Sequence, residues 1–179
     1  DKLRTDFERR KSEVNAKWTL TPALGITQLS YVETHVNPYF ATLLTPKLGI
    51  VYGFAEHWSL GISAFGTAAS LTASDPNVSV RFLGLNARAG FGFSTFGARR
   101  ASWKTNLMVG GYSLSMFVSD RSMGFDRMFG PQLVIAQQKI IDLDNSLSAY
   151  VKYSALIVGS NISLTKREWA GGVAYSRVF

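Results

Sequence analysis

The sequence contains no cysteine, few charged residues and no long uninterrupted apolar run. The absence of cysteine excludes disulfide frameworks, zinc–thiolate sites and catalysis by a thiol. Charged residues make up 17% of the 179 residues, well below the roughly 25% of a typical soluble domain. The longest stretch without a charged side chain, residues 57–74, is interrupted by Ser, Thr and Gly and therefore does not predict a transmembrane helix.

The chain is rich in apolar and aromatic side chains, at 46% and 13% of its residues, and this content excludes a disordered chain. The mean hydropathy is nevertheless only +0.07, because Gly, Ser and Thr lie among the apolar residues. A chain that is too apolar for a typical soluble domain and too interrupted for membrane helices favours a membrane β-barrel.

The first sixteen residues differ from the rest, because nine of them are charged. Thr5 and Glu8 have the spacing of a capping box. Leu3, Phe7 and Val14 then fall on one face of a helix over about residues 6–15. A docked periplasmic helix and a solvated linker both fit this pattern. The sequence thus predicts a charged segment at 1–16 followed by one barrel domain at 17–179.

From residue 17 onward, apolar and polar residues alternate with period two, which is typical of β-strands with two different faces. Only in the fifth predicted strand do Leu114, Met116 and Val118 reverse the alternation, which leaves their face open. Short turns are predicted after the second, fourth and sixth strands, at 55–57, 97–100 and 142–145, and longer loops, including 159–168, after the others. The fold class predicted is all-β, an eight-stranded antiparallel up-and-down transmembrane β-barrel with both termini at one end. Its strands cover about 17–27, 39–54, 58–71, 78–96, 102–118, 128–141, 147–158 and 169–179.

A soluble eight-stranded barrel of the lipocalin kind is the alternative, with its apolar face inside and a charged exterior. In this chain the polar face of the strands consists mainly of Gly, Ser, Thr and Asn. Such small side chains suit a narrow interior better than a solvated surface. The membrane arrangement is therefore favoured.

The last predicted strand resembles the C-terminal β-signal of bacterial outer-membrane barrels. Val173, Tyr175 and Phe179 supply the apolar and aromatic positions of that signal, whereas Arg177 departs from its usual aromatic or apolar choice. Together with the eight strands, this ending makes residues 17–179 similar to the OmpA-type transmembrane domain.

The resemblance implies a location in the bacterial outer membrane, with both termini in the periplasm. It also implies assembly by the barrel-assembly machinery and contact with outer-membrane lipids, including lipopolysaccharide. Aromatic residues near the strand ends would form the girdles at the two membrane interfaces: Trp18, Tyr39, Trp58, Trp103 and Trp169. The resemblance implies no particular function, because one fold serves many functions.

The net charge is +7, and four basic residues fall on the proposed interior face: Lys47, Arg88, Lys104 and Lys152. The twelve acidic residues are all assigned to the N-terminal segment, to loops and turns, or to strand ends. An unpaired buried charge is unfavourable. We therefore expect either a hydrated interior or an acidic partner from outside, such as Asp6, Glu8 or Glu13.

The sequence predicts no enzyme and no cofactor or metal. His35 and His57 are expected at opposite ends of the barrel and cannot share a site, and no nucleophile elbow or cluster of metal ligands is present. Nucleic acid is not an expected partner, despite a pI of about 9.8, because no basic stripe is evident.

Small residues on the proposed lipid face, Ala64, Gly66 and Ala68, would allow a second barrel to approach closely. They are joined on the same face by Ala87, Ala89 and Gly171. With Leu3, Phe7 and Val14 as a periplasmic clasp, these residues predict a homo-oligomer; alternatively, they only accommodate the curvature of the barrel. The function predicted is structural or membrane-organising. A narrow pore, through one barrel or an assembly, and a loop-mediated adhesin or binder are the alternatives.

Overall fold

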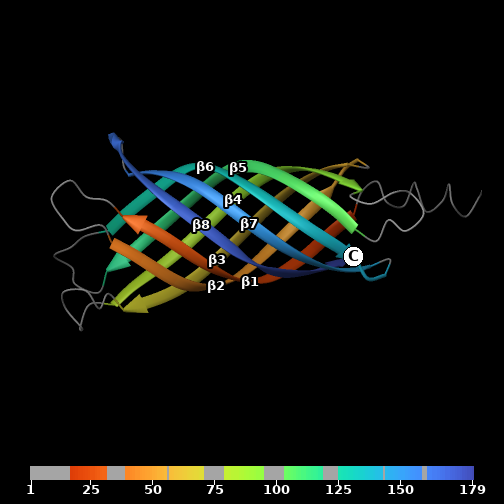
Figure 1. Ribbon diagram of the computed structural model, residues 1–179, viewed down its shortest axis with the longest axis horizontal. Coiled ribbons are helices and arrows are strands. Elements are labelled where there is room, and N and C mark those ends of the chain that lie inside the picture. Colours follow the sequence, from red (N-terminus) through yellow and green to blue (C-terminus); the bar gives the residue numbers. More distant parts are fainter. Residues whose placement is uncertain are drawn as a thin grey trace, which may run out of the picture.

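The described residues form a closed barrel of eight antiparallel strands, in which each strand pairs with its neighbours in sequence and β8 pairs with β1 (Figure 1). The computed structural model describes residues 17–31, 39–55, 57–70, 79–94, 103–118, 125–142, 144–158 and 161–179. The strands are β1 (Lys17–Tyr31), β2 (Tyr39–Gly53), β3 (Trp58–Ser70), β4 (Ser79–Ser94), β5 (Trp103–Val118), β6 (Phe125–Ile140), β7 (Asn145–Val158) and β8 (Asn161–Val178).

The predicted eight-stranded antiparallel barrel is confirmed. The expected N-terminal helix, with Leu3, Phe7 and Val14, lies outside the described residues, as does the predicted turn at 97–100. No helix in the described part of the chain is long and apolar enough to cross a membrane.

One strand boundary differs from the prediction in a way that matters for the interior. Residues 159–168 were expected to form a loop, but β8 begins at Asn161 and carries Glu168 near its middle. The expectation that no acidic residue lies within a strand is therefore wrong. The charged run 166–168 is typical of a solvated loop. However, Ile162 and Leu164, which precede this run, already show the alternation that is typical of a strand.

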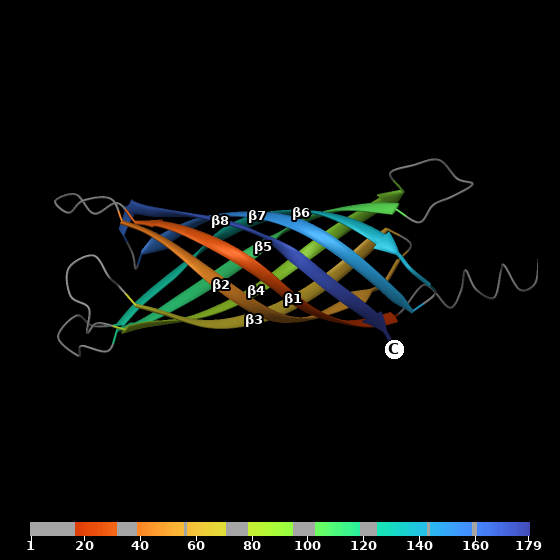
Figure 2. The ribbon, with the colours of Figure 1, turned by 60° about the horizontal axis from the view of Figure 1, so that its bottom comes forward.

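Strand β1 begins and β8 ends at the same end of the barrel, at the right of Figure 1, and Figure 2 shows the same arrangement. We call this the terminal end, and the opposite end the far end. At the terminal end, β6 and β7 are joined by a turn in which Asp142 Oδ1 accepts hydrogen bonds from the backbone amides of Asp144 and Asn145, at 2.9 and 2.8 Å. Such a side-chain bond to nearby amides fixes a tight turn.

The two faces of each strand lie in different surroundings, as the period-two pattern predicts. The exterior consists largely of exposed apolar side chains, such as Leu24, Leu44 and Val109, and Ile62 is 61% exposed. The interior contains buried small and polar side chains, such as Thr45 and Ser154. An apolar surface of this extent is rare on monomeric soluble proteins. It is the surface expected of a barrel that faces lipid.

Candidate functional site

The interior of the barrel is divided into a cavity at the terminal end and a filled region near the far end. The cavity has a volume of about 720 Å³. Its lining reaches from the turn residues Ala55, His57 and Asp142 to Lys47 and Lys152 deep within the barrel. The cavity is therefore a vestibule that begins at the terminal end of the barrel.

Five buried apolar side chains, each at most 5% exposed, fill the interior beyond the vestibule: Leu43, Phe82, Leu114, Met128 and Leu156. Each lies a few residues from the far end of its strand, and none of the five lines the vestibule. We call these residues the apolar layer. β5 pairs with β4 and β6 without a register shift, so Leu114 is an inward apolar residue on a regular strand. The reversed alternation in this segment thus marks the place where the interior changes from a polar lining to apolar side chains.

Two aromatic rings separate the vestibule from the apolar layer. The rings of Phe65 and Tyr112 stack with centroids 6.2 Å apart, and both side chains are buried. The ring of Phe65 lies against Gly84 of the neighbouring strand, where a Cβ atom would collide with it. Gly84 is therefore required for the ring to lie flat against the wall of the barrel.

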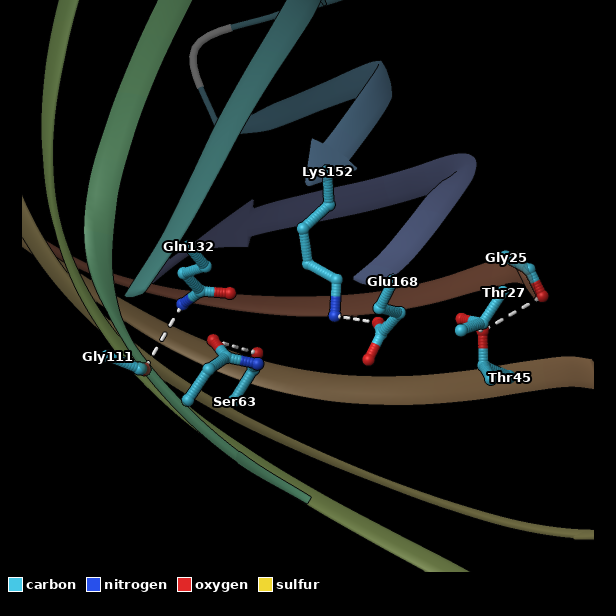
Figure 3. Close-up of polar contacts among 9 residues, drawn as sticks. Gly25, Thr27, Thr45, Ser63, Gly111, Gln132, Lys152 and Glu168 are labelled. Atoms are coloured by element: carbon cyan, nitrogen blue, oxygen red, sulfur yellow. Dashed lines mark hydrogen bonds and ion pairs between the residues drawn. The ribbon is translucent and has the colours of Figure 1, made fainter. Parts of the chain in front are cut away.

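A buried ion pair, drawn in Figure 3, is formed beside these two rings by Lys152, whose Nζ lies 5.8 Å from the centroid of the Phe65 ring. Lys152 of β7 and Glu168 of β8 form a salt bridge, with side chains that are 3% and 0% exposed. The register of β7 and β8 places Glu168 opposite Ser154, two residues from Lys152 on the same face. Lys152 Nζ also lies 3.8 Å from the centroid of the Tyr112 ring, a favourable cation–π geometry. The carboxylate partner of Lys152 thus comes from the barrel wall itself.

Polar side chains link adjacent strands around the ion pair. Thr27 and Thr45 share a hydrogen bond of 3.1 Å between β1 and β2, and Ser63 donates one of 2.8 Å to Asn86 between β3 and β4 (Figure 3). Between β5 and β6, Gln132 Nε2 donates to the carbonyl oxygen of Gly111 at 3.3 Å. Buried polar groups in a narrow barrel require such partners, because no bulk water replaces them.

The structure brings the four basic residues predicted for the interior, Lys47, Arg88, Lys104 and Lys152, to the lining of one vestibule. Lys47 Nζ lies 4.9 Å from the centroid of the Tyr150 ring and 5.5 Å from that of Phe65. Sequence reasoning missed Glu168, whose assignment to a loop concealed that it lies inside. Asp6, Glu8 and Glu13, the partners considered from outside, lie outside the described residues.

The aromatic residues predicted for the membrane interfaces are on the exterior wherever their side chains are described. Trp18, Trp58 and Trp103 are exposed at or next to the first residue of β1, β3 and β5, at the terminal end. Trp169 is exposed on β8 and packs on Tyr153 with ring centroids 4.7 Å apart. Tyr39 begins β2, but its side chain lies outside the described residues.

The residues of the predicted assembly signal also lie on the exterior. Val173, Tyr175 and Phe179 are exposed, and Phe179 is 72% exposed. The backbone amide of Phe179 donates to the carbonyl oxygen of Trp18 at 2.9 Å. The end of the chain is thus joined to β1, where the barrel closes.

Some of the small residues predicted for a subunit contact lie close together on the wall. Ala64 and Gly66 on β3 face outward beside β4, where Ala87 is exposed, and Gly111 of β5 is directly opposite Ala87. We call Ala64, Gly66, Ala87 and Gly111 the small-residue patch. The side chain of Ala68 and residues Leu3, Phe7 and Val14 lie outside the described residues. Gly171 is elsewhere on the wall, because β1 and β2 separate β8 from β3.

The described residues contain no group of three or more His, Cys, Asp or Glu side chains suited to a metal ion. His57 Nδ1 donates to the carbonyl oxygen of Gly92 at 2.9 Å and its ring lies 5.6 Å from that of Phe91, so the ring is fixed against the turn. His35 lies outside the described residues.

Among the solved structures that are similar to this chain in fold are three small outer-membrane barrels. Neisserial surface protein A matches with a TM-score of 0.70 and 12% identity, over 90% of this chain and 97% of that one. The outer membrane protein OprG from Pseudomonas aeruginosa matches with a TM-score of 0.62 and 11% identity, over 92% and 97%. Ail, the attachment invasion locus protein of Yersinia pestis, matches with a TM-score of 0.57 and 12% identity, over 90% and 99%.

No family model and no curated protein matches the sequence. At identities this low, the similarity to the three structures establishes the fold alone. The chain has the fold of the small eight-stranded outer-membrane β-barrels.

Proposed function

We propose that this chain is an integral, non-enzymatic protein of a bacterial outer membrane, with a structural, membrane-organising role. In barrels of this kind the short turns face the periplasm, so the terminal end, where β1 begins and β8 ends, is assigned to that side. Outer-membrane lipids, including lipopolysaccharide, are its surroundings. Val173, Tyr175 and Phe179 are assigned to recognition by the barrel-assembly machinery.

The observation that carries the proposal is an apolar exterior around an interior that is filled near the far end. Ile62 and Leu24 on the exterior can face lipid, whereas Met128 and Leu156 of the apolar layer are 0% exposed inside. A passage for ions would have to cross this layer, and a dry apolar constriction opposes ion entry. The arrangement favours a membrane anchor or organiser over a pore through one barrel.

Conductance measurements distinguish these two functions. We expect the purified protein, inserted into a planar lipid bilayer, to give no steady channel currents. Met128→Ala and Leu156→Ala, which thin the apolar layer, are measured beside the unaltered protein. Currents that appear in these variants and not in the unaltered protein would support the view that the apolar layer closes the barrel. Stable unit conductance from the unaltered protein would instead support the narrow pore.

The small-residue patch supports self-association as the means by which the barrel organises the membrane. Small lipid-facing residues allow two backbones to approach closely in lipid, where packing rather than the hydrophobic effect drives association. At Gly66 a Cβ would lie 3.9 Å from the nearest atom, and at Gly111 it would meet nothing within 4 Å, so larger side chains there would project outward without disturbing the barrel.

The assembly can be tested with matched variants. Gly66→Leu and Gly111→Leu fill the patch, and Ala149→Leu adds a similar side chain to an exposed position on β7. Unboiled and boiled samples are compared on a mild SDS gel, and masses are measured by light scattering in detergent. We expect a high-mass unboiled band that is lost in the patch variants and kept in Ala149→Leu. A monomeric unaltered protein, or an assembly that survives both patch substitutions, would contradict the proposal.

A further inference from the structure

The vestibule has an excess of positive charge among the described residues. Five basic residues line it, against one acidic residue, Asp142, at its opening: Lys17, Lys47, Arg88, Lys104 and Lys152. Glu168 forms a salt bridge with Lys152. Lys47, Arg88 and Lys104 form no salt bridge with any residue that the structure describes. Charges held in such a confined, partly apolar space are strongly unfavourable unless an anion accompanies them.

Two buried hydrogen-bond donors at the vestibule have no partner. Arg88 Nε and Tyr150 Oη are both inaccessible to solvent and make no hydrogen bond within the described residues. Both residues belong to the lining of the vestibule. Tyr150 Oη lies over Gly25 and Gly172, where a Cβ would collide with it or lie 2.8 Å away, so the ring follows the wall and leaves the centre of the vestibule open. Because both atoms are packed against the wall, a ligand in the vestibule would contact other groups of its lining, such as the side chain of Lys47 and the rest of Arg88.

The size and lining of the vestibule limit what such a ligand can be. A volume of about 720 Å³ falls in the range of small-molecule sites, roughly 300–1,000 Å³, and is far larger than one ion needs. Apolar side chains make up much of the wall between the cations, among them Val51, Met108, Val134 and Ala136. A wall of this composition suits a ligand with an apolar body as well as an anionic group.

We infer that the vestibule binds a small organic anion, whose carboxylate or phosphate lies between Lys47 and Arg88 and whose apolar body rests on the wall beside Met108. The open end of the vestibule, at Ala55, His57 and Asp142, admits the ligand from the terminal end of the barrel. The apolar layer stops it from passing through. The site is therefore a one-ended receptor pocket. A failure of this inference leaves the proposed structural role intact, because that role rests on the exterior and the apolar layer.

Methionine methyl groups provide an internal probe and control. Met108 lines the vestibule, whereas Met128 belongs to the apolar layer. The protein is labelled with carbon-13 at its methionine methyl groups, folded in lipid nanodiscs and titrated with benzoate, phenyl phosphate, benzyl alcohol and benzylamine. We expect saturable shifts of the Met108 signal with an anion and an unmoved Met128 signal. Response to benzoate identifies a carboxylate ligand, and response to phenyl phosphate alone a phosphate ligand.

Two variants test the assignment of the cations. Arg88→Gln and Lys47→Met should each weaken anion binding about tenfold or more, since each removes a charge-assisted contact. Lys139→Gln removes an exposed lysine outside the lining and should bind as before. In the unaltered protein, two results would overturn the inference. One is a Met108 shift with benzylamine or benzyl alcohol that equals the shift with the anions, and the other is no saturable shift with either anion. Undiminished binding by a folded Arg88→Gln variant would also overturn it.

Discussion

Replacing Glu168 with Gln should destabilise the folded barrel by about 3–5 kcal/mol, the range expected when one partner of a buried ion pair is removed. The upper part of this range applies because the side chains of Lys152 and Glu168 are only 3% and 0% exposed, so water solvates little of the lysine left behind. The Tyr112 ring, 3.8 Å from Lys152 Nζ, remains in place. A cation–π contact contributes only about 0.5–2 kcal/mol and does not replace the carboxylate.

The double variant Lys152→Met/Glu168→Leu separates the pair from its surroundings. It removes both charges while keeping similar volumes, and such replacements are often neutral or stabilising. We therefore expect the double variant to be more stable than Glu168→Gln alone. Unfolding by urea in lipid vesicles, followed by tryptophan fluorescence, gives the free energies, and the exposed Arg177→Gln serves as control. A loss below about 1 kcal/mol for Glu168→Gln, or a double variant no more stable than Glu168→Gln, would refute the reasoning.

Three further predictions concern packing and the turn between β6 and β7. Gly84→Ala should destabilise the barrel by about 1–3 kcal/mol, because its methyl group collides with the ring of Phe65; a midpoint of urea unfolding equal to that of the unaltered protein would contradict this. Leu156→Ala should cost about 2–5 kcal/mol in the same assay, because it leaves a cavity in the apolar layer at a fully buried position. A hydrogen bond from the Asn145 side chain holds the pKa of Asp142 below its usual range. The stability from this bond is complete above the unfolded pKa, about 3.9, and is lost as pH falls through the lowered folded pKa. Unfolding midpoints measured between pH 5 and pH 2 should thus fall less in Asp142→Asn than in the unaltered protein, and parallel curves would count against the prediction.

The strands could be predicted from the sequence because each side chain of a barrel wall faces one of two different surroundings. Ile62 and Ser63 are neighbours in the chain, yet one is 61% exposed on the exterior and the other is 8% exposed in the interior. That contrast appears directly as period two. The four interior cations could be predicted by the same alternation.

The ion pair could not be predicted, because it depends on the register between two strands. Lys152 and Glu168 are sixteen residues apart, and only the pairing of Ser154 with Glu168 brings them together. The charged run 166–168 favoured a loop, since local composition does not indicate that a strand continues through it. The contact of Phe65 with Gly84 likewise depends on the pairing of β3 with β4.

The cysteine-free chain allows a direct test of the central claim, that the apolar face of this barrel faces lipid. Single cysteines at Ile62 and Ser63 carry a nitroxide label, and the collision rates of each label with oxygen and with a water-soluble nickel complex are measured in lipid vesicles. The account predicts that the label at Ile62→Cys collides mainly with oxygen, which concentrates in lipid, and is shielded from the nickel complex. The label at Ser63→Cys, in the lining of the vestibule, should collide little with oxygen. Frequent collisions of the Ile62→Cys label with the nickel complex would show a water-facing exterior and contradict the membrane barrel.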